Sequence, residues 1–229
     1  MVTRQTDRSK AKAKNVKERS VLEMAPAEAH DFFLKPESYC SVELPPYFCF
    51  DKILSDVSKI LKGKSLVDMS SKPHQHEGVN YSLLSNKDGR HAWRPFQFIH
   101  PALYVSLVDQ MTAPEQWAVI LERFRLFRAL PRFACLSMPV QSLSMPKDKA
   151  AQILQWWQGI EQRSIELAME YEYVFHADIT DCYSSIYTHS IVWALHDKEV
   201  ARRRRKDKTL IGNVIDWHIQ DMRHGQKIG

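Results

Sequence analysis

The stretch FHADITDCYSSI, residues 175–186, decides how this chain is interpreted. Within it and just before it, two sets of side chains alternate, namely Tyr173, Phe175, Ala177 and Ile179 against Val174, His176 and Asp178. A period of two is typical of a β-strand, so we expect a strand over residues 173–179. The first set is predicted to pack on helices, and the second, which ends in Asp178, to face a cleft. A carboxylate in that position is a suitable ligand for a divalent cation.

Helices are predicted on both sides of this strand. Between Asp148 and Tyr171 one face is apolar and the other is charged, which indicates a long helix. Two more helices, Ser190–Lys206 and Leu210–Met222, are expected to cover the apolar face of the strand. The elements expected upstream are helices over Ala25–Leu34, Phe50–Leu61, from Pro101 onward and over Trp117–Phe127, and a hairpin of Val79–Leu84 with Ala92–Ile99. Residues 131–147, with several prolines and serines, are predicted to be a loop.

The overall composition favours a globular protein that does not enter membranes. The chain has 229 residues, of which 44% are hydrophobic and 26% are charged, as is common in globular domains. No apolar run approaches the roughly 20 residues that span a membrane, and the N-terminus lacks the apolar core of a secretion signal. The four cysteines are scattered, which indicates reduced thiols rather than a zinc site or disulfides. We therefore expect a cytoplasmic protein.

Positive charge is concentrated in two places, and the formal net charge is +5. One is the first 19 residues, and the other is the run from Arg202 to Lys208. Both could bind the phosphate backbone of a nucleic acid, although a solvated tail and a solvated helix face fit the charge pattern equally well. Residues 1–24 are predicted to form a disordered basic arm, because most of them carry no large apolar group.

Residues 178–186 resemble, position by position, the first palm motif of reverse transcriptases. The resemblance implies that Asp178 binds both Mg²⁺ ions of a two-metal site and that the backbone carbonyl of Ile179 helps to hold one of them. It also implies that Asp181 and Cys182 line the pocket for the sugar of the nucleotide, and that Tyr183 excludes a 2′-hydroxyl. Considered without the resemblance, Asp178 could instead cap the next helix, and Tyr183 could be a core aromatic residue.

Residues 87–95, KDGRHAWRP, resemble the fingers hairpin of the same enzymes. The resemblance implies that Lys87 and Arg94 bind the triphosphate of the incoming nucleotide. The chemistry agrees, because arginine offers a planar fork of donors to phosphate and lysine a mobile point charge. On a strand, Arg94 and Trp93 point to opposite faces, so one can pack while the other reaches a cleft. Lys87 could equally be a solvated turn residue.

Three further stretches read like bacterial reverse transcriptases linked to retrons, abortive infection and phage defence. They are FFLKPESY at residues 32–39, Trp156-Trp157 with Glu161-Gln162, and SIYTHSIVWAL at residues 185–195. The resemblance covers roughly residues 30 to 229. It implies an α+β fold, with mostly helical fingers that contain a β-hairpin and an incomplete polymerase palm in which a strand packs on helices. The expected division is an arm over residues 1–24, fingers over 25–147 and a partial palm over 148–229.

The function implied is RNA-directed DNA polymerisation, a nucleotidyl transfer, in antiviral defence. The implied partners are Mg²⁺, deoxynucleoside triphosphates, an RNA template and a DNA or RNA primer, with a non-coding RNA and a separate C-terminal chain as further candidates. Two metal ions need more carboxylates than Asp178 alone. The family's Pro-Gln-Gly segment and its hairpin with two adjacent aspartates are not found in these residues. We therefore expect this polypeptide alone to be inactive, as a fragment, a truncated product or half of a split enzyme.

Two other functional classes remain open. A non-catalytic nucleic-acid-binding module could use the basic arm, the arginine run and the aromatic residues for contacts that do not depend on base sequence. A phosphatase or nuclease could use Asp178 and Asp181, but their spacing of three differs from that of haloacid-dehalogenase-type phosphatases, and no partner lysine is recognisable.

Overall fold

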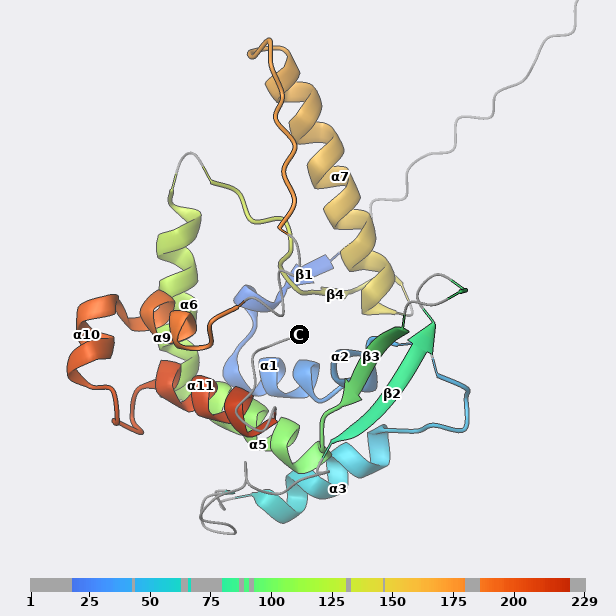
Figure 1. Cartoon of the computed structure of the whole chain (residues 1–229), viewed down its shortest axis with the longest axis vertical. Coiled ribbons are helices and arrows are strands. Elements are labelled where there is room, and N and C mark those ends of the chain that lie inside the picture. The colour runs from blue at the N-terminus through green and yellow to red at the C-terminus, as the bar shows by residue number, and fades with distance from the viewer. Residues whose placement is uncertain are drawn as a thin grey trace, which may run out of the picture.

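A computed structural model of the chain describes residues 18–42, 44–62, 66, 80–86, 89–90, 93–130, 133–145, 147–179 and 186–222. These residues form a mixed α+β fold in which helices predominate, with two small antiparallel sheets (Figure 1). Among the described helices, none is both long enough and apolar enough to cross a membrane.

Most of the predicted elements are present. The first half contains β1 (Glu18–Ser20), the 3-10 turn η1 (Val21–Glu23), α1 (Pro26–Phe33), α2 (Pro36–Tyr39), α3 (Asp51–Leu61), β2 (Tyr81–Asn86), β3 (Trp93–Phe98), α5 (Pro101–Met111) and α6 (Pro114–Arg128). The second half contains β4 (Val140–Ser142), α7 (Asp148–Ala168), α9 (His189–His196), α10 (Lys198–Arg203) and α11 (Ile211–Met222). Proline begins α1, α5 and α6, where its missing N–H costs no helical hydrogen bond.

Residues 18–24, predicted to belong to a disordered arm, are part of the fold. Strand β1 pairs with β4, which lies inside the predicted loop 131–147. The backbone N–H of Val21 donates to the Pro139 carbonyl at 3.0 Å. Val21, Met24 and Val140 are buried, and their burial gives this end of the chain the apolar contacts that an isolated arm would lack. Residues 1–17 lie outside the described residues.

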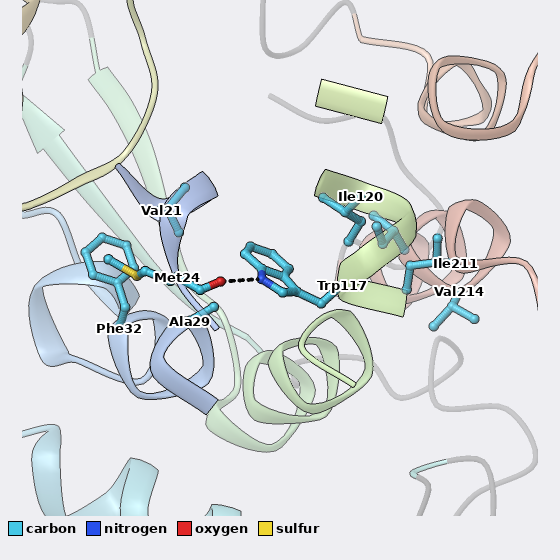
Figure 2. Packing of buried hydrophobic residues seen from close by; sticks show 9 residues of the cluster. Val21, Met24, Ala29, Phe32, Trp117, Ile120, Ile211 and Val214 are labelled. Carbon is cyan, nitrogen blue, oxygen red and sulfur yellow. Dashed lines mark hydrogen bonds between the residues drawn. The ribbon is translucent and has the colours of Figure 1, made fainter. Parts of the chain in front are cut away.

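The largest core cluster joins the N-terminal segment to the C-terminal helices. Trp117 of α6 lies between Val21, Met24 and Phe32 on one side and Ile211 of α11 on the other (Figure 2). Its indole Nε1 donates a hydrogen bond to the Met24 carbonyl at 3.0 Å (Figure 2), so the one polar atom of this buried side chain is satisfied. A second cluster packs α3 against α5 through Leu54, Leu61 and Val105.

The predicted strand over residues 173–179 is wrong for this structure. After α7, which extends away from the body of the molecule, the chain turns back as an extended segment (Figure 1). All residues from 171 to 179 are exposed, and none of the four described strands pairs with this segment. A strand is stabilised by hydrogen bonds to a neighbouring strand, and the alternating sequence alone does not provide that neighbour. The apolar face of the segment is likewise not packed on helices, because Phe175 is 90% exposed.

The predicted helix over residues 190–206 is interrupted. It consists of α9 and α10, which meet at Asp197 with a backbone φ of 68°. With ψ at 152°, this is an extended positive-φ conformation that residues other than glycine rarely adopt. The Asp197 side chain accepts a hydrogen bond from the Lys198 N–H at 2.5 Å and so caps α10. The sequence shows no glycine or proline at this position that would have signalled the break.

Candidate metal and nucleic-acid site

Asp178 lies on the exposed extended segment that follows α7. One oxygen of its carboxylate, Oδ1, accepts a hydrogen bond from the backbone N–H of Ile179 at 2.8 Å. Among the described residues, no other group forms a hydrogen bond with this carboxylate. The group is therefore accessible and retains free lone pairs, as a cation ligand must.

The residues present can supply one carboxylate ligand to a Mg²⁺ ion. The described residues contain no cluster of three or more His, Cys, Asp or Glu side chains arranged to hold a metal. Mg²⁺ is often bound by one or two carboxylates together with waters and substrate phosphates, which Asp178 could do in part. Asp181, Cys182 and Tyr183, the other residues predicted for this site, lie outside the described residues. Their predicted roles stay predictions.

The predicted hairpin is confirmed as β2 and β3. Its register pairs Ser85 with Arg94 and Asn86 with Trp93. The turn contains Gly89 at a φ of 75°, a conformation that suits glycine, and the Gly89 N–H donates to the Asn86 side chain at 2.7 Å. Lys87 lies outside the described residues, as does the side chain of Arg94, so a role in phosphate binding stays a prediction for both.

The described part of the basic arm uses its arginine within the fold. Both terminal nitrogens of Arg19 donate to the Glu28 carboxylate at 2.7 Å, and one also donates to the Glu23 carbonyl at 2.8 Å. Hydrogen bonds from Arg19 and from the backbone N–H of Ala25 lower the pKa of Glu28 to about 2. Arg19 therefore holds β1 to the start of α1 instead of presenting a free charge to a nucleic acid.

The arginine run divides into paired and unpaired residues. Arg203 contacts Glu199 at 3.4 Å, and Arg204 contacts Asp207 at 2.6 Å. The pKa of Asp207 is lowered to about 2, first by hydrogen bonds from the side chain and backbone of Thr209 and then by Arg204. Arg202, Arg205 and Lys206 are exposed, and no described carboxylate pairs with any of the three.

Two polar clusters were not predicted from the sequence. In the first, Lys35 donates to the buried carboxylate of Asp148 at 2.6 Å, and the Asp148 N–H donates to Glu37 at 3.1 Å. Burial and the negative charge of Asp148 raise the pKa of Glu37. Lys35 and Asp148 are 113 positions apart in the sequence, so no local sequence pattern indicates that they form an ion pair.

The second cluster surrounds Asp216 on α11, which is buried. His189 lies 2.5 Å from one of its oxygens, measured from Nδ1, and the Gln220 amide donates to the other at 2.8 Å. A signal existed for this cluster, because Asn213, Asp216 and Gln220 follow helical spacing and so share one side of α11.

Comparison with known proteins adds no further assignment, because no protein-family model and no curated protein matches the chain.

Proposed function

We propose that this chain supplies the fingers and the first part of the palm of a bacterial reverse transcriptase of the defence-associated kind. The observation that carries the proposal is the accessible Asp178 carboxylate, within a motif that resembles the metal-binding motif of that family. The β2–β3 hairpin supports it, because the stretch that resembles the fingers hairpin is a hairpin in the structure, with the turn at Gly89.

The proposed roles follow the resemblance. Asp178 and the Ile179 carbonyl hold Mg²⁺, Asp181 and Cys182 line the sugar pocket, and Tyr183 excludes a 2′-hydroxyl. The remaining two residues, Lys87 and Arg94, bind the triphosphate. In this proposal the enzyme copies an RNA template from a DNA or RNA primer.

Completion of the site requires protein beyond the described residues. Two-metal catalysis holds the ions about 3.5–4 Å apart, and one carboxylate cannot position both. The exposed apolar side chains along α7 and the segment after it, including Trp157, Ile165 and Phe175, provide a surface on which further strands could pack. We propose that a region with two adjacent aspartates, either in the same polypeptide or in a second chain, covers this surface.

Primer extension tests the proposal. The substrate is a homopolymer RNA template with a DNA primer, Mg²⁺ and the matching deoxynucleoside triphosphate, and the protein is extended through the two adjacent aspartates. Asp178→Asn is expected to lower the rate by at least about a hundredfold, because a metal ligand supports several kcal/mol of transition-state stabilisation. Asp56→Asn is the control, because this exposed carboxylate on α3 pairs with Lys59 at 3.5 Å and is outside the motif. Full activity of the Asp178→Asn protein would exclude the assignment.

A non-catalytic nucleic-acid-binding module is the second candidate. The observation that favours it is the set of exposed cations in the arginine run that have no described carboxylate partner, namely Arg202, Arg205 and Lys206. Such a module would bind single-stranded RNA with an affinity that falls steeply as salt rises. It would show no binding of deoxynucleoside triphosphates at the β2–β3 hairpin, whereas the polymerase proposal requires that binding.

A further inference from the structure

A pocket of about 470 Å³ lies among α9, α10 and α11. Its size is within the usual range for sites that bind small molecules. Its lining combines three kinds of group: cations from the end of α10 and the turn after it, aromatic rings from both sides of the pocket, and polar side chains from α11. The lining includes Arg202, Arg205, Lys206, Tyr187, Trp193 and Asp216. We call it the α9–α11 pocket.

The cations that line this pocket are those left without a described carboxylate partner. Arg202, Arg205 and Lys206 line the pocket, whereas Arg203 and Arg204 are paired with Glu199 and Asp207 and do not line it. Neighbouring cations repel one another unless an anion lies between them. The pocket therefore gathers three positive charges, which favours an anion such as a phosphate group. The Asp216 carboxylate also lines the pocket, where it is held by His189 and Gln220.

Aromatic rings form another part of the lining. Tyr187 is 53% exposed and Trp193 is 38% exposed, and their ring centroids lie 5.8 Å apart. Lys198 places its ammonium 5.3 Å from the Trp193 ring centre. The Tyr187 ring meets the His189 ring edge to face, with centroids 4.9 Å apart, and it is the more exposed ring of the Tyr187–Trp193 pair. An exposed aromatic face beside a cluster of cations is the combination that binds the bases and the backbone of single-stranded nucleic acids.

The polar side chains of the pocket are held in fixed orientations. Asp216 is 3% exposed and binds His189 and Gln220 through its two oxygens. Because Nδ1 of His189 is engaged in this contact, Nε2 is the ring nitrogen left to bond a ligand. The carbonyl oxygen of Gln220 is similarly left as an acceptor when its amide nitrogen donates to Asp216.

The turn that carries the cations is also fixed. Asn213 is buried, and its amide nitrogen donates to the carbonyls of Arg204 and Asp207 at 2.8 Å each. Asp207 in turn accepts hydrogen bonds from Thr209. A turn held by these contacts presents Arg205 and Lys206 from an ordered backbone, so that only their side chains have to be ordered when a ligand binds.

We propose that the α9–α11 pocket binds a phosphorylated nucleoside, with the phosphate on Arg202, Arg205 and Lys206 and the base against Tyr187. The source of this unit is either a free nucleotide or one residue of a single-stranded nucleic acid. The inference goes beyond the proposed polymerase function and does not depend on a metal ion at Asp178.

The test measures binding of an adenylate RNA hexamer, of AMP and of an abasic ribose-phosphate hexamer at fixed salt. The pocket variant is Arg202→Ala with Arg205→Ala. The matched control is Arg203→Ala with Lys208→Ala, which removes the same charge from the same region but no group that lines the pocket. The pocket variant is expected to weaken binding at least about tenfold, since it removes charge-assisted hydrogen bonds to phosphate, which are stronger than neutral ones. The control is expected to change binding less than about threefold, as a general charge effect.

A third variant, Tyr187→Ala, tests the base. It is expected to weaken binding of the adenylate hexamer about tenfold, in line with the contribution of one stacked base, and to leave binding of the abasic hexamer unchanged. Binding of AMP as tight as that of the hexamer would identify a nucleotide site, and much weaker binding of AMP would identify a site for single-stranded nucleic acid.

Equal losses of affinity in the pocket variant and the charge-matched control, or no loss in either, would overturn the proposal. So would an abasic hexamer that binds as tightly as the adenylate hexamer. Thermal unfolding of each variant checks that the fold is intact.

Discussion

Asp148 connects two distant parts of the chain through a buried charge. Its Oδ2 accepts from Lys35 at 2.6 Å and its Oδ1 accepts from the Ser142 N–H at 2.8 Å. The Asp148 side chain is 6% exposed, whereas that of Lys35 is 32% exposed. Loss of the carboxylate would leave the Ser142 N–H and the lysine without their partner in a largely dry site, which is costly.

Asp148→Ala is therefore expected to lower the free energy of unfolding by about 2–4 kcal/mol, below the upper end for a fully buried pair because Lys35 keeps some contact with water. Asp56→Ala, which removes the exposed pair with Lys59, is the matched control and should change the free energy of unfolding by less than about 0.5 kcal/mol. Urea unfolding followed by circular dichroism measures both. Equal stability of the two variants would show that the Asp148 contacts contribute little.

At the scale of elements, the close approach of α9 and α11 depends on Gly212. A β-carbon at this position would lie 2.8 Å from Cδ2 of His196 and 2.9 Å from the backbone Cα of Val192. The His196 side chain also accepts a hydrogen bond from the Gly212 N–H at 3.0 Å. The backbone of α9 cannot give way without movement of the whole helix, so the added carbon would separate the two helices.

Gly212→Ala is expected to destabilise the protein by about 1–3 kcal/mol, as overpacking does, despite a gain of up to about 1 kcal/mol in helix propensity. Gly159→Ala on α7 is the control. There the new β-carbon would meet the end of the Leu136 side chain at 3.2 Å, and a flexible side chain can move. Chemical denaturation should find Gly159→Ala neutral or slightly stabilising. If Gly212→Ala were equally benign, α9 and α11 would not be packed as closely as the structure has them.

The elements that were predicted correctly are those that local sequence specifies. The helix over residues 51–61 follows from the spacing of apolar residues, and the hairpin from its turn residues around Gly89. The β1–β4 pairing was missed because each strand has only three residues and the two strands lie more than a hundred positions apart in the sequence. No local pattern indicates that such short segments pair. The strand over residues 173–179 was predicted from alternation alone, but alternation describes side-chain faces and does not supply a partner strand.

At the scale of the whole molecule, the candidate site was only partly predictable. The sequence singled out Asp178, and the structure makes its carboxylate accessible. The sequence also singled out the arginine run. It did not show which of these cations are paired and which line the pocket, because that depends on Glu199, Asp207 and the helix break at Asp197. Tertiary geometry, rather than charge pattern, decides which cations remain available to a ligand.

The packing of α11 on α5 makes stability depend on pH through His218. Its Nδ1 lies 2.8 Å from the Val214 carbonyl, which can only accept, so Nδ1 carries the proton. Nε2 then accepts from the Ser106 hydroxyl at 3.0 Å. Burial lowers the pKa of His218 below its ordinary 6.5, despite opposing effects from the Val214 carbonyl and Asp221. Burial also lowers the pKa of His196, helped by Arg204 and Arg123.

Both histidines are therefore neutral in the folded protein at a pH where the unfolded chain has begun to bind protons. Because the unfolded state then holds more protons, the free energy of unfolding should fall as the pH decreases through about 6.5 toward the lower folded pKa values. Thermal unfolding between pH 7.5 and 6.0 should show a falling Tm. His218→Gln should reduce the slope of Tm against pH. Carboxyl groups such as Glu37, whose pKa is raised, contribute equally to both proteins, so the difference between the two slopes reports His218. An unchanged slope in His218→Gln would mean that the His218 imidazole takes up its proton as readily in the folded protein as in the unfolded chain.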